Sequence, residues 1–197
     1  MTAVQLETQR LLLRELISAD ADVIVDFSND PEFDRYRLRS QRSEAVTRRS
    51  VHQAILASTL IPRMYYALAI VPKPSTTAAE NSLVGVLTLS LDWNPVLLAN
   101  IGFEIHPAHW GRGYATEAAF AALQMSFDEL GVASVMADCF AANQASIRVM
   151  EKIGMQRSRS WIDSIALRVA YGEMRPVVRH QVRRDEWQQR LYRKDPE

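Results

Sequence analysis

The sequence predicts one domain over residues 1–197 with an α+β architecture built on a mixed sheet. The order of the expected elements is the first reason. A strand, two helices and three strands come before helix and strand alternate, whereas a doubly wound fold alternates throughout. The composition is the second reason, since 48% apolar and 23% charged residues are typical of a globular chain. The third is that no internal repeat and no linker divides the chain.

The chain opens with a strand and a helix. We expect the strand at Arg10–Leu16 and the helix at about 21–27, with Ser18 or Asp20 as its N-cap. Asn29-Asp30-Pro31 then breaks this helix, because a residue before proline is disfavoured in helical backbone.

A second helix is expected from Ser43, its N-cap, to about Thr59. Its inward residues are expected to be Val46, Val51, Ile55 and Leu56. The overlapping segment Asp34–Arg49 is rich in arginine. It has two interpretations, a surface for phosphate, RNA or an acidic substrate, and a solvated helix face.

Three strands follow, at Met64–Val71, Leu83–Leu91 and Ile101–Ile105, each rich in aromatic, β-branched and other apolar residues. The first two indicate a hairpin across residues 72–81, whose prolines and small polar residues are typical of a loop. Trp93-Asn94-Pro95 is the turn into the third strand.

The second half alternates helix and strand. A core-facing helix begins at Gly113 and ends near Gly131, with inward residues Ala115, Ala118, Ala119, Ala122, Leu123 and Leu130. Ser134–Cys139 is the next strand. The helix from Asn143 to Gly154 carries a stripe of Ser146, Val149, Met150 and Ile153.

The C-terminal part completes the sheet. Residues 156–183 predict two antiparallel strands at its end. Arg184–Tyr192 predicts a terminal turn or helix anchored by Trp187 and Leu191.

The turn after Ile101–Ile105 carries the first functional signal. Two glycines flank a cation in Gly111-Arg112-Gly113, and glycine lets bare backbone approach a ligand closely. The first turn of the following helix leaves its N–H groups unpaired, so the segment predicts a phosphate or other anion site. It matches neither the Walker A loop nor the dinucleotide fingerprint. A tight strand-to-helix turn without a ligand is the alternative that the glycines leave open.

Charge, cysteine content and hydropathy narrow the functional class. A formal net charge of zero gives no strong field to attract nucleic acid or a membrane. No apolar stretch approaches the roughly 20 residues that span a bilayer, and the start of the sequence does not resemble a signal peptide. Cys139 is the single cysteine, which fits a reducing, cytoplasmic compartment. The four histidines lack metal-ligand spacing, so we expect no metal.

These segments together resemble the GNAT superfamily of acyl-CoA N-acyltransferases. The resemblance is carried by Gly111–Ala115 before an alanine-rich helix, by Asn143-x-x-Ser146 and by Lys152–Met155. Three further segments resemble the branch of ribosomal-protein N-terminal alanine acetyltransferases, RimJ and RimL: Thr8–Arg14, Asn29–Glu32 and Arg184–Trp187. The resemblance covers about residues 8 to 188.

The resemblance implies the GNAT fold, a mixed, strongly curved sheet of about seven strands with helices on both faces. Ile101–Ile105 and Ser134–Cys139 would splay apart and hold the pantetheine arm of acetyl-CoA, the implied cosubstrate. The pyrophosphate would lie on the amides of Gly111, Arg112, Gly113, Tyr114, Ala115 and Thr116. Ile105, His106, Asn143 and Ser146 complete the implied cofactor-binding set. Trp110 stands where the family usually has Gln or Arg, which removes a polar side chain but no backbone donor.

The implied activity is that of an acetyl-CoA-dependent N-acetyltransferase, in which a primary amine attacks the thioester directly within a ternary complex. This chemistry needs a neutral amine and a stabilised oxyanion. Glu104 is the candidate base, directly or through water. Desolvation between the two splayed strands would raise the pKa of its carboxylate and make it a stronger base. The alternative for Glu104 is a strand residue that faces solvent. A backbone N–H at the end of Ile101–Ile105 is the candidate oxyanion donor.

The thiolate leaving group also needs a partner. Met150 stands where many relatives have a tyrosine, so the family's usual proton donor is missing. Ser146 matches a serine of the RimJ/RimL branch and is the implied replacement. The alternative is that Ser146 is a small residue that permits close helix–sheet packing. Cys139 is interpreted as a buried strand residue and not as a nucleophile.

The branch resemblance favours a protein N-terminal α-amine as the acceptor. The α-amine has a pKa of about 8, so roughly a tenth of it is neutral at pH 7, far more than for a lysine. A small-molecule amine such as a polyamine or antibiotic, and a CoA-binding module without turnover, are the alternatives. The protein is expected to be a monomer or a homodimer.

Overall fold

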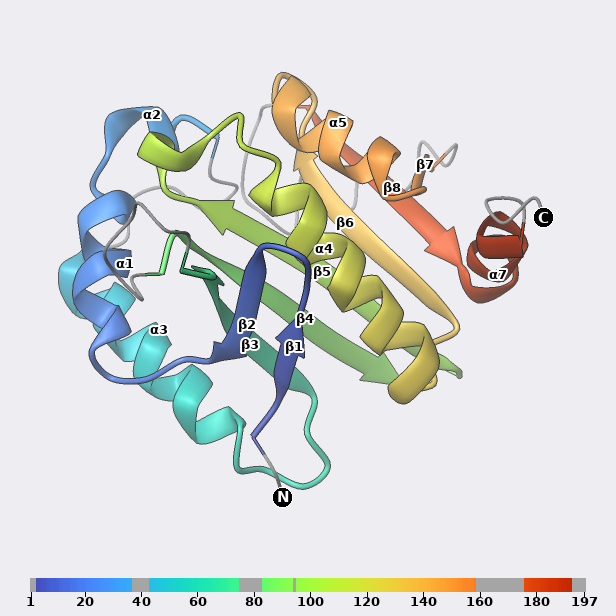
Figure 1. Ribbon diagram of the computed structural model, residues 1–197, viewed down its shortest axis with the longest axis horizontal. Helices are drawn as coiled ribbons and strands as arrows, with labels where there is room; N and C mark the ends of the chain where they lie inside the picture. The colour runs from blue at the N-terminus through green and yellow to red at the C-terminus, as the bar shows by residue number, and fades with distance from the viewer. Residues whose placement is uncertain (1–2, 37–42, 75–82, 94, 159–175, 193–197) are drawn as a thin grey trace.

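The computed structural model describes residues 3–36, 43–74, 83–93, 95–158 and 176–192. Within them an eight-stranded sheet runs in the order β1-β2-β3-β4-β5-β6-β8-β7 (Figure 1). The β5–β6 pair is parallel, and the other neighbouring strands are antiparallel. The predicted α+β fold with a mixed sheet is therefore confirmed. Among the described residues, no helix has the length and apolar character needed to cross a membrane.

The strands are β1 (Gln5–Glu7), β2 (Leu11–Glu15), β3 (Tyr65–Pro72), β4 (Gly85–Trp93), β5 (Leu97–Ile105), β6 (Ser134–Phe140), β7 (Gln156–Arg157) and β8 (Val177–Arg183). The helices are α1 (Asp20–Ser28), α2 (Pro31–Asp34), α3 (Glu44–Ala57), α4 (Tyr114–Gln124), α5 (Gln144–Lys152) and α7 (Arg184–Tyr192). A short 3₁₀ turn at Pro107–His109 precedes α4, and a π-helical turn at Met125–Glu129 extends it.

The elements differ from the expectation in several places. The sheet has one strand more than expected, because β1 is too short for its three residues to show a period. The strand expected to begin at Ile101 begins at Leu97 and pairs with β4 along its whole length. The Asn29-Asp30-Pro31 segment does end α1, but it also begins α2. Asp30 accepts hydrogen bonds from the amides of Glu32 and Phe33, at 2.8 and 3.4 Å, and Pro31 occupies the first helical turn.

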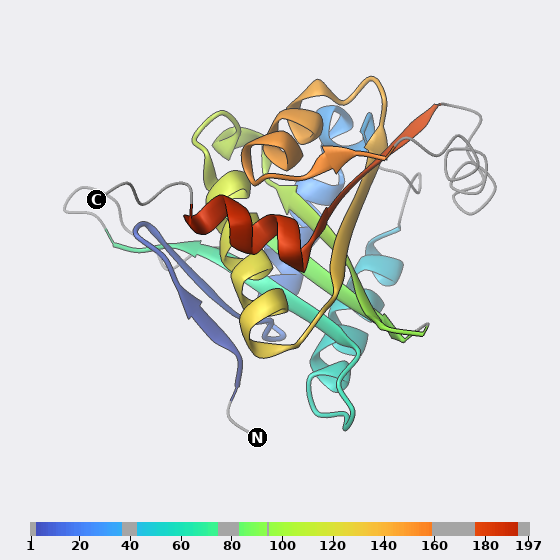
Figure 2. The same ribbon diagram turned by 90° about the vertical axis from the view of Figure 1, so that its right-hand side faces the viewer.

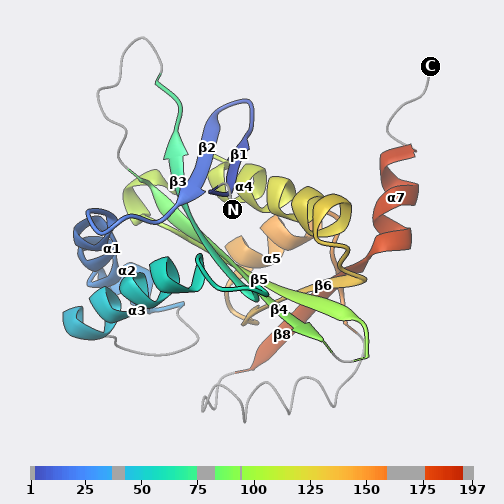
Figure 3. The same ribbon diagram turned by 90° about the horizontal axis from the view of Figure 1, so that it is seen from below.

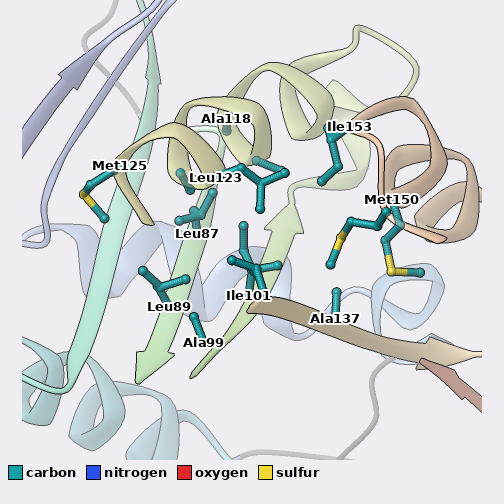
Figure 4. Packing of buried hydrophobic residues seen from close by; sticks show 14 of the residues in the cluster. Leu87, Leu89, Ala99, Ile101, Ala118, Leu123, Met125, Ala137, Met150 and Ile153 are labelled. Atoms are coloured by element: carbon teal, nitrogen blue, oxygen red, sulfur yellow. The ribbon is translucent and has the colours of Figure 1, made fainter. Parts of the chain in front are cut away.

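Helices lie on both faces of the sheet (Figure 3), and a hydrophobic cluster lies on each face. On one face α4 and α5 pack on β4, β5 and β6, where Ala118 and Leu123 lie over Leu87 and Ile101 (Figure 4). On the other face α1, α2 and α3 cover β3 and β4, with Phe27 and Phe33 in edge contact at 5.1 Å. Helices on both faces are what the GNAT resemblance implied.

The expected buried faces are right for most helices and only half right for α3, where Val51 is buried and Ile55 partly buried as expected. Val46 and Leu56 are exposed, and the buried stripe is Thr47, Val51 and Ala54. These three residues have the i, i+4, i+7 spacing of one helix face. A search for apolar residues alone misses this face, because its first member is a threonine.

The terminal helix α7 is anchored as expected. Trp187 is fully buried, with ring centroids 5.0 Å from Phe120 and 5.8 Å from Phe127, which places α7 beside α4 (Figure 2). The other expected anchor, the side chain of Leu191, lies outside the described residues, as do most of the loop expected at 72–81, residues 37–42 of the arginine-rich segment and residues 159–175.

Candidate active site

The sheet opens between its two parallel strands. Pairing of β5 with β6 runs from Leu98–Ser134 to Asn100–Met136 and stops there, so the strands diverge from Ile101 and Ala137 onward (Figure 1). The opening is part of a cleft of about 840 Å³. Its walls come from β5, β6, the loop before α4, the start of α5, and α2. The expected splay of the two central strands is therefore present.

The glycine loop at the cleft has the backbone that its sequence predicts. Gly111 and Gly113 have φ values of +74° and +81°, a region that residues with a Cβ rarely adopt. Gly113 is the N-cap of α4, and no side chain caps this helix end. Among the described residues, the amides of Gly111 to Thr116 donate to no protein acceptor, while the flanking amides of Trp110 and Glu117 bond to Pro107 and Gly113. A row of unpaired donors at a helix start suits a diphosphate.

The turn before this loop is fastened to the end of β5. Trp110 donates from Nε1 to the carbonyl oxygen of Ile105 at 2.7 Å. His106 lies outside the cleft lining: its amide donates to Val84 at 2.8 Å, and its Nδ1 accepts from the amide of Ala108. Arg112 also lies outside the lining, with its guanidinium 3.3 Å from the carbonyl oxygen of Ala108. Arg112 thus belongs to the row of unpaired amides through its backbone N–H, while its side chain bonds back to Ala108.

The ladder between β4 and β5 fixes which way the end of β5 presents its backbone. In an antiparallel pair, alternate residues bond to the same partner strand, and those between them point to the other side. Because the amide of His106 donates to Val84, the residue directly before β4, the N–H of Ile105 points away from β4, toward β6. The ladder to β6 has already ended at Asn100, so within the described chain this N–H has no strand partner.

Glu104 and the α4–α5 layer lie on opposite faces of the sheet. Ile101 and Ile105 belong to the cluster under α4, and successive residues of a strand alternate between faces. Glu104 therefore faces the α1–α2 side, as does its cross-strand neighbour Val86. It lines the cleft but is exposed, so the desolvation expected for it is absent from the structure.

The α5 end of the cleft holds the predicted asparagine and serine. Asn143 is the N-cap of α5, and its Oδ1 accepts from the amide of Ser146 at 3.1 Å, which leaves its amide nitrogen for other partners. Both side chains line the cleft. Met150 is fully buried. Burial and the nearby Asp138 raise the pKa of Cys139 to about 12, so this thiol stays protonated, in line with the interpretation of Cys139 as a strand residue.

Several cleft residues were not singled out from the sequence. The lining includes Glu32 and Phe33 of α2 and Tyr36, which follows this helix. The Asp30-Pro31 helix start was the available signal for them, because it places a short helix directly after α1. Asp138 also lines the cleft and is held by Arg179 at 2.8 Å.

His109 is a further lining residue, in the turn between β5 and the glycine loop. Burial lowers its pKa, and the charge of Arg112 and the neighbouring His106 add to the effect. The imidazole is therefore neutral near pH 7.

Comparison with known proteins assigns the family. Residues 10–156 match the model of the acetyltransferase (GNAT) domain. The uncharacterized N-acetyltransferase YoaA of Bacillus subtilis is 30% identical over 153 residues, which cover 77% of this chain and 82% of that protein. The chain belongs to the GNAT acetyltransferase family and is an acetyl-CoA-dependent N-acetyltransferase.

Solved structures of this fold include enzymes for different acceptors. The spermidine N-acetyltransferase of Vibrio cholerae, in complex with CoA and spermine, superposes with a TM-score of 0.70 at 18% identity, over 92% of this chain and 99% of that one. RimL, the ribosomal L7/L12 α-N-protein acetyltransferase, superposes with a TM-score of 0.69 at 16% identity, over 93% and 96%. At these identities the likeness shows the fold and leaves the acceptor open.

Proposed function

We propose that this enzyme transfers the acetyl group of acetyl-CoA to a protein N-terminal α-amine by direct attack in a ternary complex. One observation supports acetyl-CoA as the donor. The unpaired amides from Gly111 to Thr116 lie beside the gap between the diverging strands β5 and β6. The residues present fit the cosubstrate, because the loop offers backbone donors for a diphosphate and the cleft leads from it between the strands.

We assign the oxyanion contact to the N–H of Ile105. The thioester supplies an electrophilic carbonyl carbon and a thiolate leaving group. The Ile105 N–H points into the splay from a strand that β4 holds rigid, so it is already oriented for the negative charge that develops on the carbonyl oxygen. His106, whose amide is bonded to Val84, is left out of this assignment.

Ser146 and Asn143 are assigned to the thiol side of the cleft. Within the described residues the hydroxyl of Ser146 has no hydrogen-bond partner, and Asn143 fixes the first turn of α5 that carries it. A thiolate with a pKa of about 8.5 leaves readily near neutrality, so one hydrogen bond from the serine suffices.

Glu104 is assigned as the base on the acceptor side. It faces α1 and α2, away from α4, so an amine that enters from that side meets it before the thioester. Because the side chain of Glu104 is exposed to solvent, we expect an acceptor amine that gives up its proton readily. This requirement favours an α-amine, with a pKa of about 8, over a lysine or polyamine nitrogen near 10.

The segments that resemble the RimJ/RimL branch favour the same acceptor, and the fold shared with RimL is compatible with it. A polyamine is the second candidate, and one observation favours it. The acceptor side is lined by Glu32 and Glu104, two exposed carboxylates that suit a cationic chain. The spermidine enzyme shares the fold.

Two measurements test the proposal. Isothermal titration with acetyl-CoA should show saturable binding, and its absence at high micromolar concentration would overturn the donor site. Thiol release is then followed with a panel of unblocked peptides and a panel of polyamines and aminoglycosides. Release with peptides alone supports the α-amine assignment. Binding without release on either panel would instead indicate a CoA-binding module without turnover.

A further inference from the structure

The first turn of α4 is tied to the turn between β1 and β2, a segment more than 100 positions away in the sequence. The carboxylate of Glu117 accepts three hydrogen bonds from that turn. They come from Thr8 Oγ1 at 2.6 Å, the Arg10 amide at 2.8 Å and Arg10 Nε at 2.7 Å. Glu117 follows the unpaired amides directly, so this contact holds the helix start that carries them.

The guanidinium of Arg10 continues from Glu117 to the glycine loop itself. Its Nη1 donates to the carbonyl oxygen of Arg112 at 3.0 Å, and its Nη2 forms an ion pair with Glu117 at 2.6 Å. Its Cζ lies 5.3 Å from the ring centroid of Tyr114. A Cβ added to Gly113 would lie 3.3 Å from Nη2, so the missing side chain makes room for the guanidinium.

The contact with Arg112 has a geometric consequence for Gly113. The carbonyl of Arg112 and the N–H of Gly113 belong to one planar peptide group, in which the two point in opposite directions. Holding the oxygen on the Arg10 side therefore turns the N–H of Gly113 away from Arg10. Residues of this loop line the cleft, and Gly113 is among them.

We propose that Arg10 is a positioning residue of the donor site, which fixes the Arg112–Gly113 peptide so that the Gly113 N–H faces the diphosphate of acetyl-CoA. Glu117 keeps Arg10 in this place through the bond to Nε and the ion pair to Nη2. The proposal rests on the proposed role of the loop in binding the diphosphate. Arg10 is not assigned a direct contact with the cosubstrate.

Arg10 and Glu117 lie outside the hydrophobic core, which makes a purely structural role testable. The Arg10 side chain is 49% exposed, and together with Thr8 and Glu117 it borders a second cavity of about 500 Å³, which shares Gly113 and Thr116 with the cleft. Arg48 is a matched control. Its side chain is 45% exposed and pairs with Asp22 at 2.7 Å and with Glu44 at 2.8 Å, on α3 and away from the cleft lining.

The test compares two donors that differ in the diphosphate. Binding of acetyl-CoA is measured by isothermal titration, and binding of S-acetylpantetheine, which lacks the diphosphate, by ligand-observed NMR. We expect R10A to weaken acetyl-CoA binding roughly tenfold, as when one charge-assisted hydrogen bond is lost, and to leave S-acetylpantetheine binding unchanged. R10K should not restore affinity, because an ammonium lacks the planar fork that reaches Glu117 and Arg112 together. R48A should change neither.

Three outcomes would overturn the proposal. An equal loss for both donors would indicate a general structural role of Arg10. Full affinity in R10K would indicate a contact between charge and phosphate, and full affinity in R10A would show that the peptide is held without Arg10. R10Q gives the same comparison should R10A fail to fold. Failure of the wild-type chain to bind acetyl-CoA would reject the proposed function as well, whereas the other outcomes leave it standing.

Discussion

The indole Nε1 of Trp110 lies 2.7 Å from the carbonyl oxygen of Ile105 and donates a hydrogen bond to it. This bond closes the turn between β5 and the glycine loop, so the two backbone elements assigned to the thioester and to the diphosphate are held at a fixed separation. The tryptophan replaces the polar residue usual at this position in the family by a donor that acts inside the turn.

Trp110→Phe keeps the ring and removes the donor. We expect kcat/KM for acetyl-CoA to fall several-fold, because the end of β5 and the loop lose their common anchor. The loss of stability should stay near 1 kcal/mol, the usual contribution of one hydrogen bond at a site that is 43% exposed. Trp93→Phe is the control, since Trp93 is 69% exposed at the far end of β4. Equal kinetics in the two variants would contradict the anchoring role.

Glu104→Gln tests the assigned base. We expect kcat to fall by about 10²-fold, within the range of general base catalysis, while the affinity for acetyl-CoA is unchanged. Steady-state kinetics with the accepted amine measure both. Glu32→Gln alters the other exposed carboxylate on the same side of the cleft and should act on the KM of the acceptor. A fall in kcat that is equal in both variants would point to a shared electrostatic effect instead of proton removal.

Gly113→Ala tests the backbone of the loop. A Cβ at φ +81° costs about 1–2 kcal/mol, and the strain falls on the peptides that carry the unpaired amides. We expect a lower melting temperature together with weaker binding of acetyl-CoA. Gly131→Ala is the matched control, because Gly131 has φ +73° but does not line the cleft. It should lower the melting temperature to a similar extent and leave the affinity intact.

Cys139→Ala separates direct attack from a covalent route. With a pKa raised to about 12, the thiol is protonated at neutral pH, and we expect the variant to retain turnover within about twofold. The wild-type thiol should also react slowly with a disulfide reagent until the protein is unfolded. A complete loss of turnover in a variant of unchanged stability would indicate an acetyl-cysteine intermediate.

The stability of the fold should depend on pH through Glu117. Burial alone would raise the pKa of Glu117, but the hydrogen bonds from Thr8 and Arg10 outweigh it and hold the pKa below its ordinary value of 4.5. A lowered pKa in the folded state stabilises the fold above pH 4.5, and this contribution is lost as the pH falls further. Urea unfolding should therefore show E117Q to be less stable than the wild type at pH 7, with the gap closing below pH 4.5. A gap that is constant with pH would contradict this assignment.

The sequence was most informative where a residue type is strongly associated with one structural position. Gly111 and Gly113 indicated the loop, and both have a positive φ in the structure. Ser43 indicated the start of α3, and its side chain accepts a hydrogen bond from the amide of Val46. The alanines of α4 identified its buried face, because small side chains at helical spacing favour close packing on a sheet.

Contacts between distant segments could not be predicted in the same way. Nothing local shows that Glu117 would bind Arg10, since both are ordinary surface residues in their own segments. The approach of α2 to the cleft depends on how α1 packs on the sheet. Glu104 is exposed because it borders the open cleft, and the residues of its own strand do not reveal this.

Glu104 and the glycine loop lie on opposite faces of the sheet. The sheet therefore separates them, and within the described residues the gap between β5 and β6 connects the two faces. Under the proposed assignment the donor would approach from the layer of α4 and α5 and the amine from the layer of α1 and α2, and the two substrates would meet beside the end of β5. Each product can then withdraw on the side from which its precursor came. If the proposed acceptor is right, a long polypeptide could present its end from the α1–α2 side without passing the nucleotide.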